Sequence, residues 1–357
     1  MYPLDYRHLI EKYDPTAQYE VLRAFPDQVR VGIAAVDRLK TGWPKKGAFR
    51  SVLIAGMGGS AIVGDALRCF AESRSPYPIS LRRDYRLPAW VGNDTLLIAV
   101  SYSGTTEETL AVFEEAASRG CPRIVIASGG VLAERAEKLG VPLIRIPSGY
   151  APRFAFGYLF FAILRLAEVL GIVTLRPGEV EGALGAIAEA VGRFSDWNDP
   201  GNPAVALAER LHGFMPVIYA ANGLLEAVAL RWRGQIEENA KTLAYGNVLP
   251  EMNHNEIVGW EKNPEILKRI FVIALADPDD HPAVKKRMMA TLDMIRPLAA
   301  GIHTIESTRP EPLARLCELI CLGDWVSYYL AVGIHVDPYP IRNIVALKDA
   351  LGRLERA

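Results

Sequence analysis

The 357-residue sequence has little cysteine and no excess of charge of either sign. Its four cysteines, Cys69, Cys121, Cys317 and Cys321, are too scattered to form a disulfide framework. Forty basic residues stand against 41 acidic ones, and the formal net charge of −1 gives no electrostatic basis for binding nucleic acid or an anionic membrane. We therefore expect neither of these as a partner.

Long hydrophobic runs and a secretory signal are also missing. An apolar run such as "FGYLFFAIL" (156–164) is shorter than the roughly 20 residues that span a bilayer. The N-terminal stretch "MYPLDYRHLIEKYD" is charged from Asp5 onward, unlike a signal peptide. Cys317 and Cys321 lie four apart in an apolar helical pattern without a neighbouring His or Cys pair, which favours core packing over a metal site. These features predict a protein of the reducing cytoplasm.

The sequence does contain two rounds of alternating strand and helix patterns. Short β-branched segments bounded by turn residues predict the strands, and amphipathic segments such as "TEETLAVFEEAASRG" predict the helices between them. This alternation predicts an α/β fold with two doubly wound parallel sheets of the flavodoxin-like kind, each a three-layer α/β/α sandwich. The expected strands are 51–56, 78–84, 95–101, 123–128 and 142–147 in the first round, and 215–222, 241–247, 270–277 and 301–308 in the second.

A change in composition separates the two rounds. Residues 173–203 combine a polar-faced helical pattern with the turn-rich stretch "SDWNDPGNP", which we interpret as a linker. The chain is long enough for two domains. We expect an N-terminal helical segment over 1–45, a first domain over 46–172, the linker over 173–203, and a second domain with the C-terminal helices over 204–357.

Two loops that follow predicted strands of the first round carry groups suited to an anion. They are "GMGGSAIVGD" (56–65) and "SYSGTTEET" (101–109), and the second contains no basic residue. The carboxyl ends of parallel strands are where α/β sheets bind ligands, and helix N-termini attract anions. Gly58 and Gly59 allow the backbone to approach a ligand closely. Hydroxyl donors are available from Ser60, Ser101, Ser103 and Thr106.

Each loop alone has another interpretation. The letters "TTEE" fit a capping box, which would make Ser103 or Thr106 part of an ordinary helix cap. The letters "GMGGSA" fit the G-x-G-x-x-A form of a dinucleotide fingerprint, although the second strand ends in "RRD" rather than in a single acidic residue. An NADP-dependent oxidoreductase is therefore an alternative.

Together the two loops resemble the sugar isomerase (SIS) domain, in which the second loop binds a sugar phosphate. The similarity continues in "SGYAPRFAFGYLF", "GQIEENAK", "LPEMNHNEIVGW" and "DWVSYYLAVGIHVDPYPI", and it covers nearly everything from about residue 45 onward. By these motifs the chain is similar to the bifunctional phosphoglucose/phosphomannose isomerases. The resemblance implies a dimeric, metal-independent enzyme without a cofactor. Its expected reaction interconverts glucose 6-phosphate, and mannose 6-phosphate, with fructose 6-phosphate, as in glycolysis and gluconeogenesis.

The resemblance also implies roles for individual residues. Glu237 is the base that moves a proton between C1 and C2, and Arg153 lies near the reacting carbons. His254 opens the sugar ring with help from Lys348, and in the family this histidine comes from the neighbouring chain. The residues implied to bind substrate are Gly58, Gly59 and Ser60 in the first loop, and Ser101, Ser103 and Thr106 around the phosphate.

Three positions depart from the pattern of the family. Val63 stands where we expect Gly, Thr105 where we expect Asn, and Ala151 where we expect Gln. None of the three is an implied catalytic group. They bear on sugar preference rather than on the reaction.

The catalytic candidates also have plain structural interpretations. Glu237 and Lys241 could form a solvated helix pair, and Arg153 could be a surface charge near the start of a helix. His254 could be a hydrogen-bonded turn histidine, and Lys348 a surface lysine. Aldose–ketose isomerisation needs a carboxylate, a cation and a group that opens the ring, and the near-neutral pKa of histidine suits the last of these.

No metal-ligand motif occurs in the sequence. The histidines at 8, 212, 281, 303 and 335 have no acids or cysteines at ligand spacing. A non-catalytic phosphosugar sensor is the other alternative. A sensor would need the phosphate loops but not the glutamate, histidine and lysine together, and residues 1–45 are too short for the DNA-binding unit that such sensors often carry.

Overall fold

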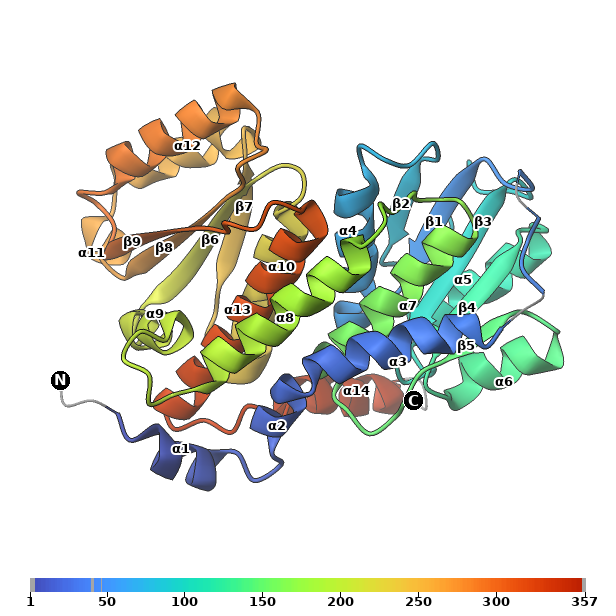
Figure 1. Cartoon of the computed structure of the whole chain (residues 1–357), viewed down its shortest axis with the longest axis horizontal. Coiled ribbons are helices and arrows are strands. Elements are labelled where there is room, and N and C mark those ends of the chain that lie inside the picture. The colour runs from blue at the N-terminus through green and yellow to red at the C-terminus, as the bar shows by residue number, and fades with distance from the viewer. Residues whose placement is uncertain (1–3, 40–41, 46, 355–357) are drawn as a thin grey trace.

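The computed structural model of this chain describes residues 4–39, 42–45 and 47–354, and it contains two parallel β-sheets (Figure 1). The first sheet has the strand order β2-β1-β3-β4-β5 and the second the order β7-β6-β8-β9. This arrangement confirms the predicted fold class. The strands are β1 (Ser51–Ala55), β2 (Ile79–Arg82), β3 (Thr95–Ser101), β4 (Arg123–Ala127), β5 (Leu143–Arg145), β6 (Met215–Ala221), β7 (Tyr245–Leu249), β8 (Ile270–Ala276) and β9 (Gly301–Glu306).

Strand β3 shows why these segments form buried parallel strands. All seven of its residues are buried. Ile98 and Val100 contribute to the hydrophobic cluster on one face of the sheet, whereas Leu97 and Ala99 contribute to the cluster on the other face. A continuous apolar run is therefore stable here because helices cover both faces.

Helices connect the strands and cover both sheets (Figure 1). We call β1–β5 with α4–α7 the first unit, and β6–β9 with α9–α13 the second unit. The α-helices are α1 (Tyr6–Tyr13), α2 (Gln18–Arg23), α3 (Phe25–Asp37), α4 (Gly58–Ala71), α5 (Glu107–Ser118), α6 (Gly130–Lys138), α7 (Phe156–Val169), α8 (Glu179–Ser195), α9 (Pro203–Leu211), α10 (Glu226–Ala240), α11 (Pro264–Leu267), α12 (Pro282–Ile295), α13 (Pro312–Gly333) and α14 (Arg342–Leu354). Three 3₁₀ turns are η1 (Pro152–Phe154), η2 (Glu251–His254) and η3 (Glu256–Glu261).

Strand β7 begins later than the pattern 241–247 predicts. Helix α10 ends at Ala240, and Lys241 adopts the left-handed conformation with φ +55° that often terminates a helix. Because residues 241–244 form this turn, the strand starts only at Tyr245. That part of the strand prediction was wrong.

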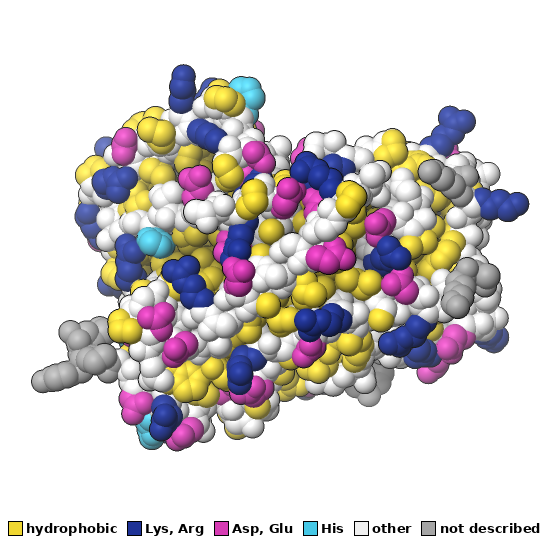
Figure 2. Space-filling view, in the orientation of Figure 1, with side chains coloured by type: hydrophobic (Ala, Val, Ile, Leu, Met, Phe, Trp, Pro, Cys, Tyr) yellow, Lys and Arg dark blue, Asp and Glu magenta, His cyan; other side chains and the backbone are white. Residues whose placement is uncertain are grey.

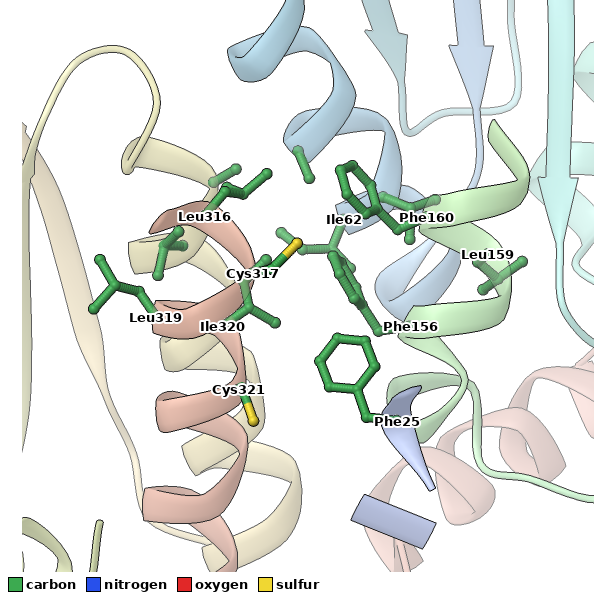
Figure 3. Packing of buried hydrophobic residues seen from close by; sticks show 14 of the residues in the cluster. Phe25, Ile62, Phe156, Leu159, Phe160, Leu316, Cys317, Leu319, Ile320 and Cys321 are labelled. Atoms are coloured by element: carbon green, nitrogen blue, oxygen red, sulfur yellow. The ribbon is translucent and has the colours of Figure 1, made fainter. Parts of the chain in front are cut away.

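Helix α13 joins the two units. On the side that faces the first unit, Cys317 and Ile320 lie opposite Ile62 of α4 and Phe156 of α7 (Figure 3). Both Cys317 and Cys321 are fully buried, which confirms their predicted role in core packing. Helix α13 is long and apolar enough to cross a membrane, which the shorter apolar runs considered in the sequence did not indicate. However, 94% of its most apolar 18-residue stretch is buried inside the protein.

Other helices extend this core. Helix α8, which we expected in the linker, packs along α13 and α3 through residues such as Ile187 and Phe194. The carboxylate of Asp14 accepts hydrogen bonds from the amides of Gln18 and Tyr19 and from the hydroxyl of Tyr328, which ties the N-terminal helices to α13. The boundaries expected for the domains remain a prediction.

The surface combines charges of both signs with exposed apolar side chains. Lys and Arg residues are interspersed with Asp and Glu residues on the face shown in Figure 2. Helix α14 differs from the other long helices because most of its apolar side chains are exposed, among them Val345 at 52% and Leu347 at 61%. This helix presents an apolar face outward.

Candidate functional site

The site lies where the carboxyl ends of the first sheet face helix α10 of the second unit. Gly58 and Gly59 begin α4 directly after β1. A Cβ atom on Gly59 would lie 2.7 Å from the carbonyl carbon of Pro152, so only glycine lets this loop touch η1. Because Pro152 precedes Arg153, this contact sets the position of the arginine beside the glycine loop.

Residues 101–106, which we call the hydroxyl loop, follow β3. The Ser101 hydroxyl donates to Thr106 Oγ1 at 3.1 Å and accepts from the Gly104 amide at 3.1 Å. Ser103 is exposed and accepts a hydrogen bond from Thr105 Oγ1 at 3.0 Å. The three predicted phosphate-binding hydroxyls, those of Ser101, Ser103 and Thr106, therefore lie on one short loop.

Thr106 occupies the N-cap position of α5 without capping the helix. Within the described part of the chain, its hydroxyl accepts from Ser101 rather than from an amide of the first turn of α5. The capping-box interpretation of "TTEE" is therefore not realised. The N-terminal amides of α5 lack a side-chain acceptor from this loop and can donate to an anion instead.

Ser60 connects the two loops. Its side chain is buried, and its hydroxyl accepts a hydrogen bond from the amide of Tyr102 at 2.9 Å. The Ser60 proton is still available for a ligand, since a hydroxyl both donates and accepts. The structure thus places Ser60 between the glycine loop and the hydroxyl loop.

Arg153 is buried in the centre of the site, with only 2% of its surface exposed. Its Nε donates to Asn239 Oδ1 at 2.7 Å, and its Nη2 donates to the carbonyls of Pro338 and Tyr339, both at 2.8 Å. Burial lowers the pKa of this guanidinium, and the nearby Glu238 opposes that effect. The surface-charge interpretation of Arg153 is wrong.

The carboxylate that faces Arg153 belongs to Glu238 and not to Glu237. Glu238 Oε2 lies 3.4 Å from Arg153 Nη1. Adjacent residues of an α-helix point about 100° apart, so Glu237 is directed away from Arg153; it lies 4.0 Å from Arg233 and lines the larger of the two cavities described below. Burial raises the pKa of Glu237, while Arg233 opposes the increase. The structure does not bring the predicted base, Glu237, to the arginine; the sequence prediction missed Glu238.

Lys241 does not pair with Glu237, contrary to the plain structural interpretation of the two residues. Its ammonium donates to three backbone carbonyls, those of Glu238, Asn239 and Pro338.

Two cavities meet at Glu238. One of about 240 Å³ is lined by Gly58, Gly59 and Arg153. The other, of about 920 Å³, is lined by Lys241 and by the segment that leads into α14.

His254 and Lys348 are not brought to this centre. His254 is exposed at the end of η2, and it does not line either cavity among the described residues. Lys348 is exposed in the middle of α14, whereas only the first turn of that helix reaches the larger cavity. One chain therefore brings together the glycine loop, the hydroxyl loop, Arg153 and Glu238, but not the predicted ring-opening pair.

The remaining predictions concern metal ions and the three departures from the family pattern. Within residues 4–39, 42–45 and 47–354, no group of His, Cys, Asp and Glu side chains could hold a metal ion. Val63 is fully buried in α4, and Ala151 is nearly buried before η1. Thr105 is the departure that touches the hydroxyl loop, through its bond to Ser103.

Comparisons with known proteins agree with this arrangement. A family model described as the bacterial phospho-glucose isomerase C-terminal SIS domain matches residues 201–351. A bifunctional phosphoglucose/phosphomannose isomerase of Caldicellulosiruptor bescii is 42% identical over 305 residues, which are 85% of this chain and 90% of that relative. One from Thermoplasma acidophilum is 35% identical over 334 residues, 93% of this chain and 96% of the relative. The fold matches that of a hypothetical protein from Thermus thermophilus, with a TM-score of 0.75 at 17% identity over 98% of this chain and 93% of that one.

Proposed function

This chain belongs to the family of bifunctional phosphoglucose/phosphomannose isomerases, and from that premise we propose a reaction and a mechanism for it. The protein interconverts glucose 6-phosphate, and mannose 6-phosphate, with fructose 6-phosphate. We place this reaction in the cytoplasm, in glycolysis and gluconeogenesis. The observation that carries the proposal is the ion pair of the buried Arg153 with the partly exposed Glu238 beside the glycine loop, which Ser60 links to the hydroxyl loop.

The hydroxyl loop binds the phosphate of the sugar. Its hydroxyls and the uncapped amides of α5 hold a dianion without any Lys or Arg. The neighbouring glycine loop allows the sugar chain to lie against the backbone and to reach Arg153. The phosphate thereby fixes the register of the sugar, so that C1 and C2 meet the catalytic groups.

Glu238 is the base that moves a proton between C1 and C2. It removes the proton from C2 of the open-chain aldose to give an enediolate, the hydroxyl proton passes from O2 to O1, and Glu238 returns its proton to C1, which yields the ketose. Arg153 has five N–H groups, and the bonds from Nε, Nη2 and Nη1 engage four of them. The remaining Nη1 hydrogen lies beside Glu238 and stabilises the negative oxygen of the enediolate.

Both aldoses enter through the same enediolate because they differ only in the configuration at C2. The face of C2 that receives the proton decides between glucose 6-phosphate and mannose 6-phosphate. A rotation about the bond between C2 and C3 within the cavity presents either face to Glu238. One base therefore serves both sugars, and no step needs a metal ion.

The ring-opening group comes from a second copy of the chain. His254 is exposed away from Glu238, so that in an isolated chain it has no substrate to act upon. Exposed apolar side chains surround the cavity entrance and α14, which suits an interface between two copies. They are Leu243, Tyr245, Tyr339, Ile344, Val345, Leu347 and Leu351. In the dimer, His254 of one chain opens the ring bound by the other, with Lys348 assisting.

The decisive test is a coupled assay of glucose 6-phosphate and mannose 6-phosphate formation from fructose 6-phosphate. We expect Glu238→Gln to lower kcat for both products by about 10²- to 10⁴-fold, because the base is lost. Glu237→Gln is the matched control on the adjacent position and should stay close to wild type. A severe loss in Glu237→Gln with normal turnover in Glu238→Gln would return the role of base to Glu237.

The same assay separates the alternative functions. EDTA should leave the activity unchanged, and inhibition that zinc reverses would contradict a metal-independent mechanism. A sensor would bind fructose 6-phosphate without turnover. Binding of NADPH, seen by its fluorescence, would favour an oxidoreductase.

Mixed dimers test the shared site. Glu238→Gln and His254→Ala are each expected to be inactive, yet refolding them together leaves one intact site in every mixed dimer. Random pairing makes about half of the dimers mixed, so activity should approach about a quarter of wild type. No recovery in demonstrated mixed dimers would place both residues in the site of one chain.

A further inference from the structure

Residues 337–341, which we call the strap, connect α13 to α14 and form part of the wall of the larger cavity. Asp337, Pro340 and Ile341 line that cavity together with Glu238. The strap has neither helical nor strand conformation. Its last carbonyl, that of Ile341, accepts from the amides of Ile344 and Val345 at the start of α14, and within the strap the Tyr339 amide donates to the Asp337 carboxylate at 2.8 Å. Its position therefore depends on contacts from outside.

Further contacts come from two cations that face the strap, the buried Arg153 and the more exposed Lys241. Arg153 Nη2 donates to the carbonyls of Pro338 and Tyr339, and Lys241 Nζ donates to the same Pro338 carbonyl at 3.1 Å. Arg153 belongs to the first unit, and Lys241 ends the helix that carries Glu238. The strap is thus fixed from both units at one shared acceptor.

The conformation of Lys241 and its hydrogen bonds to the end of α10 hold its side chain in this position. Its backbone has the left-handed conformation, which turns the side chain back over the end of α10. Besides Pro338, the ammonium binds the carbonyls of Glu238 at 2.5 Å and Asn239 at 3.2 Å. These carbonyls are among the last of α10 and have no helical donor, so the lysine closes the helix end and holds the strap at the same time.

We propose that Lys241 is a positioning residue of the isomerase site, one that orients Arg153 and Glu238 by fixing the strap between them and α14. The inference rests on the proposed function. Without the ammonium, the Pro338 carbonyl keeps only its bond to Arg153, and the strap and the end of α10 move independently. The free Nη1 hydrogen of Arg153 then loses its fixed direction toward the enediolate oxygen.

The test compares Lys241→Met, Lys241→Arg and a matched control. Lys268 also donates to a proline carbonyl, that of Pro297 at 2.7 Å, but it lines neither cavity, so Lys268→Met removes the same kind of bond elsewhere. We expect Lys241→Met to lower kcat for both aldoses by about 10- to 100-fold. The KM for fructose 6-phosphate should change much less, because the phosphate loops are intact. Lys241→Arg should recover most of the kcat, and Lys268→Met should match wild type.

The pH profile gives a second readout. Burial and the charge of Arg153 lower the pKa of Lys241 to about 8. The groups that face it are Arg153 from η1, Glu238 from α10 and Asp337 from the strap, while Glu237, His335 and Arg342 line the same cavity. Above this pH the amine has two hydrogens for three carbonyls, so kcat should fall as the pH rises through about 8. In Lys241→Arg the guanidinium stays charged, and that decline should move to higher pH.

Hydrogen exchange of the strap amides completes the test. In Lys241→Met they should exchange faster than in wild type, whereas those of Lys268→Met should not. Wild-type kcat, an unchanged alkaline limb or unchanged exchange in a folded Lys241→Met protein overturns the inference. If the wild-type protein itself does not isomerise fructose 6-phosphate, the proposed function fails instead, and the exchange measurement still reports on the strap.

Discussion

The hydroxyl loop of the first unit and residues 277–281 of the second unit occupy equivalent places in their sheets. In the first sheet β1 lies between β2 and β3, and in the second sheet β6 lies between β7 and β8 in the same way. Strand β8 therefore corresponds to β3. After β3 come hydroxyls and an uncapped helix. After β8 come Asp277, Asp279 and Asp280, and α12 is capped by the His281 ring, which accepts from the Ala283 amide. We call residues 277–281 the acidic loop.

The acidic loop binds an arginine side chain of the same chain. Arg315 of α13 donates to both carboxylate oxygens of Asp277 at 3.1 Å, and it also contacts Asp279. Arg315 and Asp277 are both almost fully buried. The place at which we propose that the first unit binds an anion therefore holds an internal ion pair in the second. The comparison teaches that topology supplies a loop position, whereas side chains decide whether it serves ligand binding or stability.

Removal of Arg315 is the strongest way to break this comparison. Arg315→Met leaves Asp277 buried without its partner, and we expect the free energy of unfolding to fall by about 3–5 kcal/mol. Urea unfolding measures this loss. The exposed pair of Arg176 and Glu311 gives the control, since Arg176→Met should cost less than about 1 kcal/mol. A folded Arg315→Met protein should keep its KM for fructose 6-phosphate; an increase there would mean that the acidic loop takes part in binding.

The hydroxyl loop should show the opposite behaviour. Ser101→Ala with Thr106→Ala should raise the KM for all three sugar phosphates by about 10- to 100-fold, because bonds to a charged phosphate are lost in ground and transition state alike. The effect on kcat should be far smaller. Steady-state kinetics measure both, and Ser118→Ala at the other end of α5 serves as the control. An unchanged KM in the double variant would remove the phosphate from this loop.

A weaker change sharpens the contrast between the two helix N-termini. His281→Ala removes the cap of α12 and should lower stability by about 1 kcal/mol. Inorganic phosphate should raise the Tm of this variant as much as that of wild type, because the anion binds at α5. Thermal unfolding with and without phosphate checks this. A larger phosphate effect in His281→Ala would show that uncapping alone creates an anion site at α12.

The smallest expected effect concerns Thr105, which lies on the hydroxyl loop and, among the residues that the structure describes, forms its hydrogen bonds with Ser103. Thr105→Asn changes an exposed side chain, so stability should change by less than about 0.5 kcal/mol. The ratio of kcat/KM for glucose 6-phosphate to that for mannose 6-phosphate should shift by about twofold or less. Competition between the two aldoses measures this ratio, and a large shift would make Thr105 a determinant of sugar preference.

The parts of the fold that were predictable are those where a local pattern is unambiguous. The run "TLLIAVS" coincides with β3 because buried parallel strands are apolar throughout. Strand β7 was misplaced because the left-handed turn at Lys241 has no distinctive residue. The sequence also located the glycine loop and the hydroxyl loop, but it could not show that Thr106 leaves α5 uncapped.

The residues that we propose as catalytic were harder to predict for a geometric reason. Glu237 and Glu238 are adjacent and chemically identical, and only the packing of α10 decides which one faces Arg153. The burial of Arg153 depends on the strap, which is 185 residues away in the chain. The contribution of Lys241 depends on the same strap. Contacts over such distances leave no periodic trace in a sequence.

The central position of α13 has a consequence for synthesis on the ribosome. This helix supplies the surface on which α8, α9 and α10 pack, yet it ends at residue 333 of 357 and leaves the ribosome after all three. Until then the sides of those helices that face α13 lack this partner, although the cluster on the other face of the second sheet contains no residue of α13. The nascent chain therefore carries exposed apolar surface on these helices until α13 has been made. It needs protection from aggregation until its last long helix emerges.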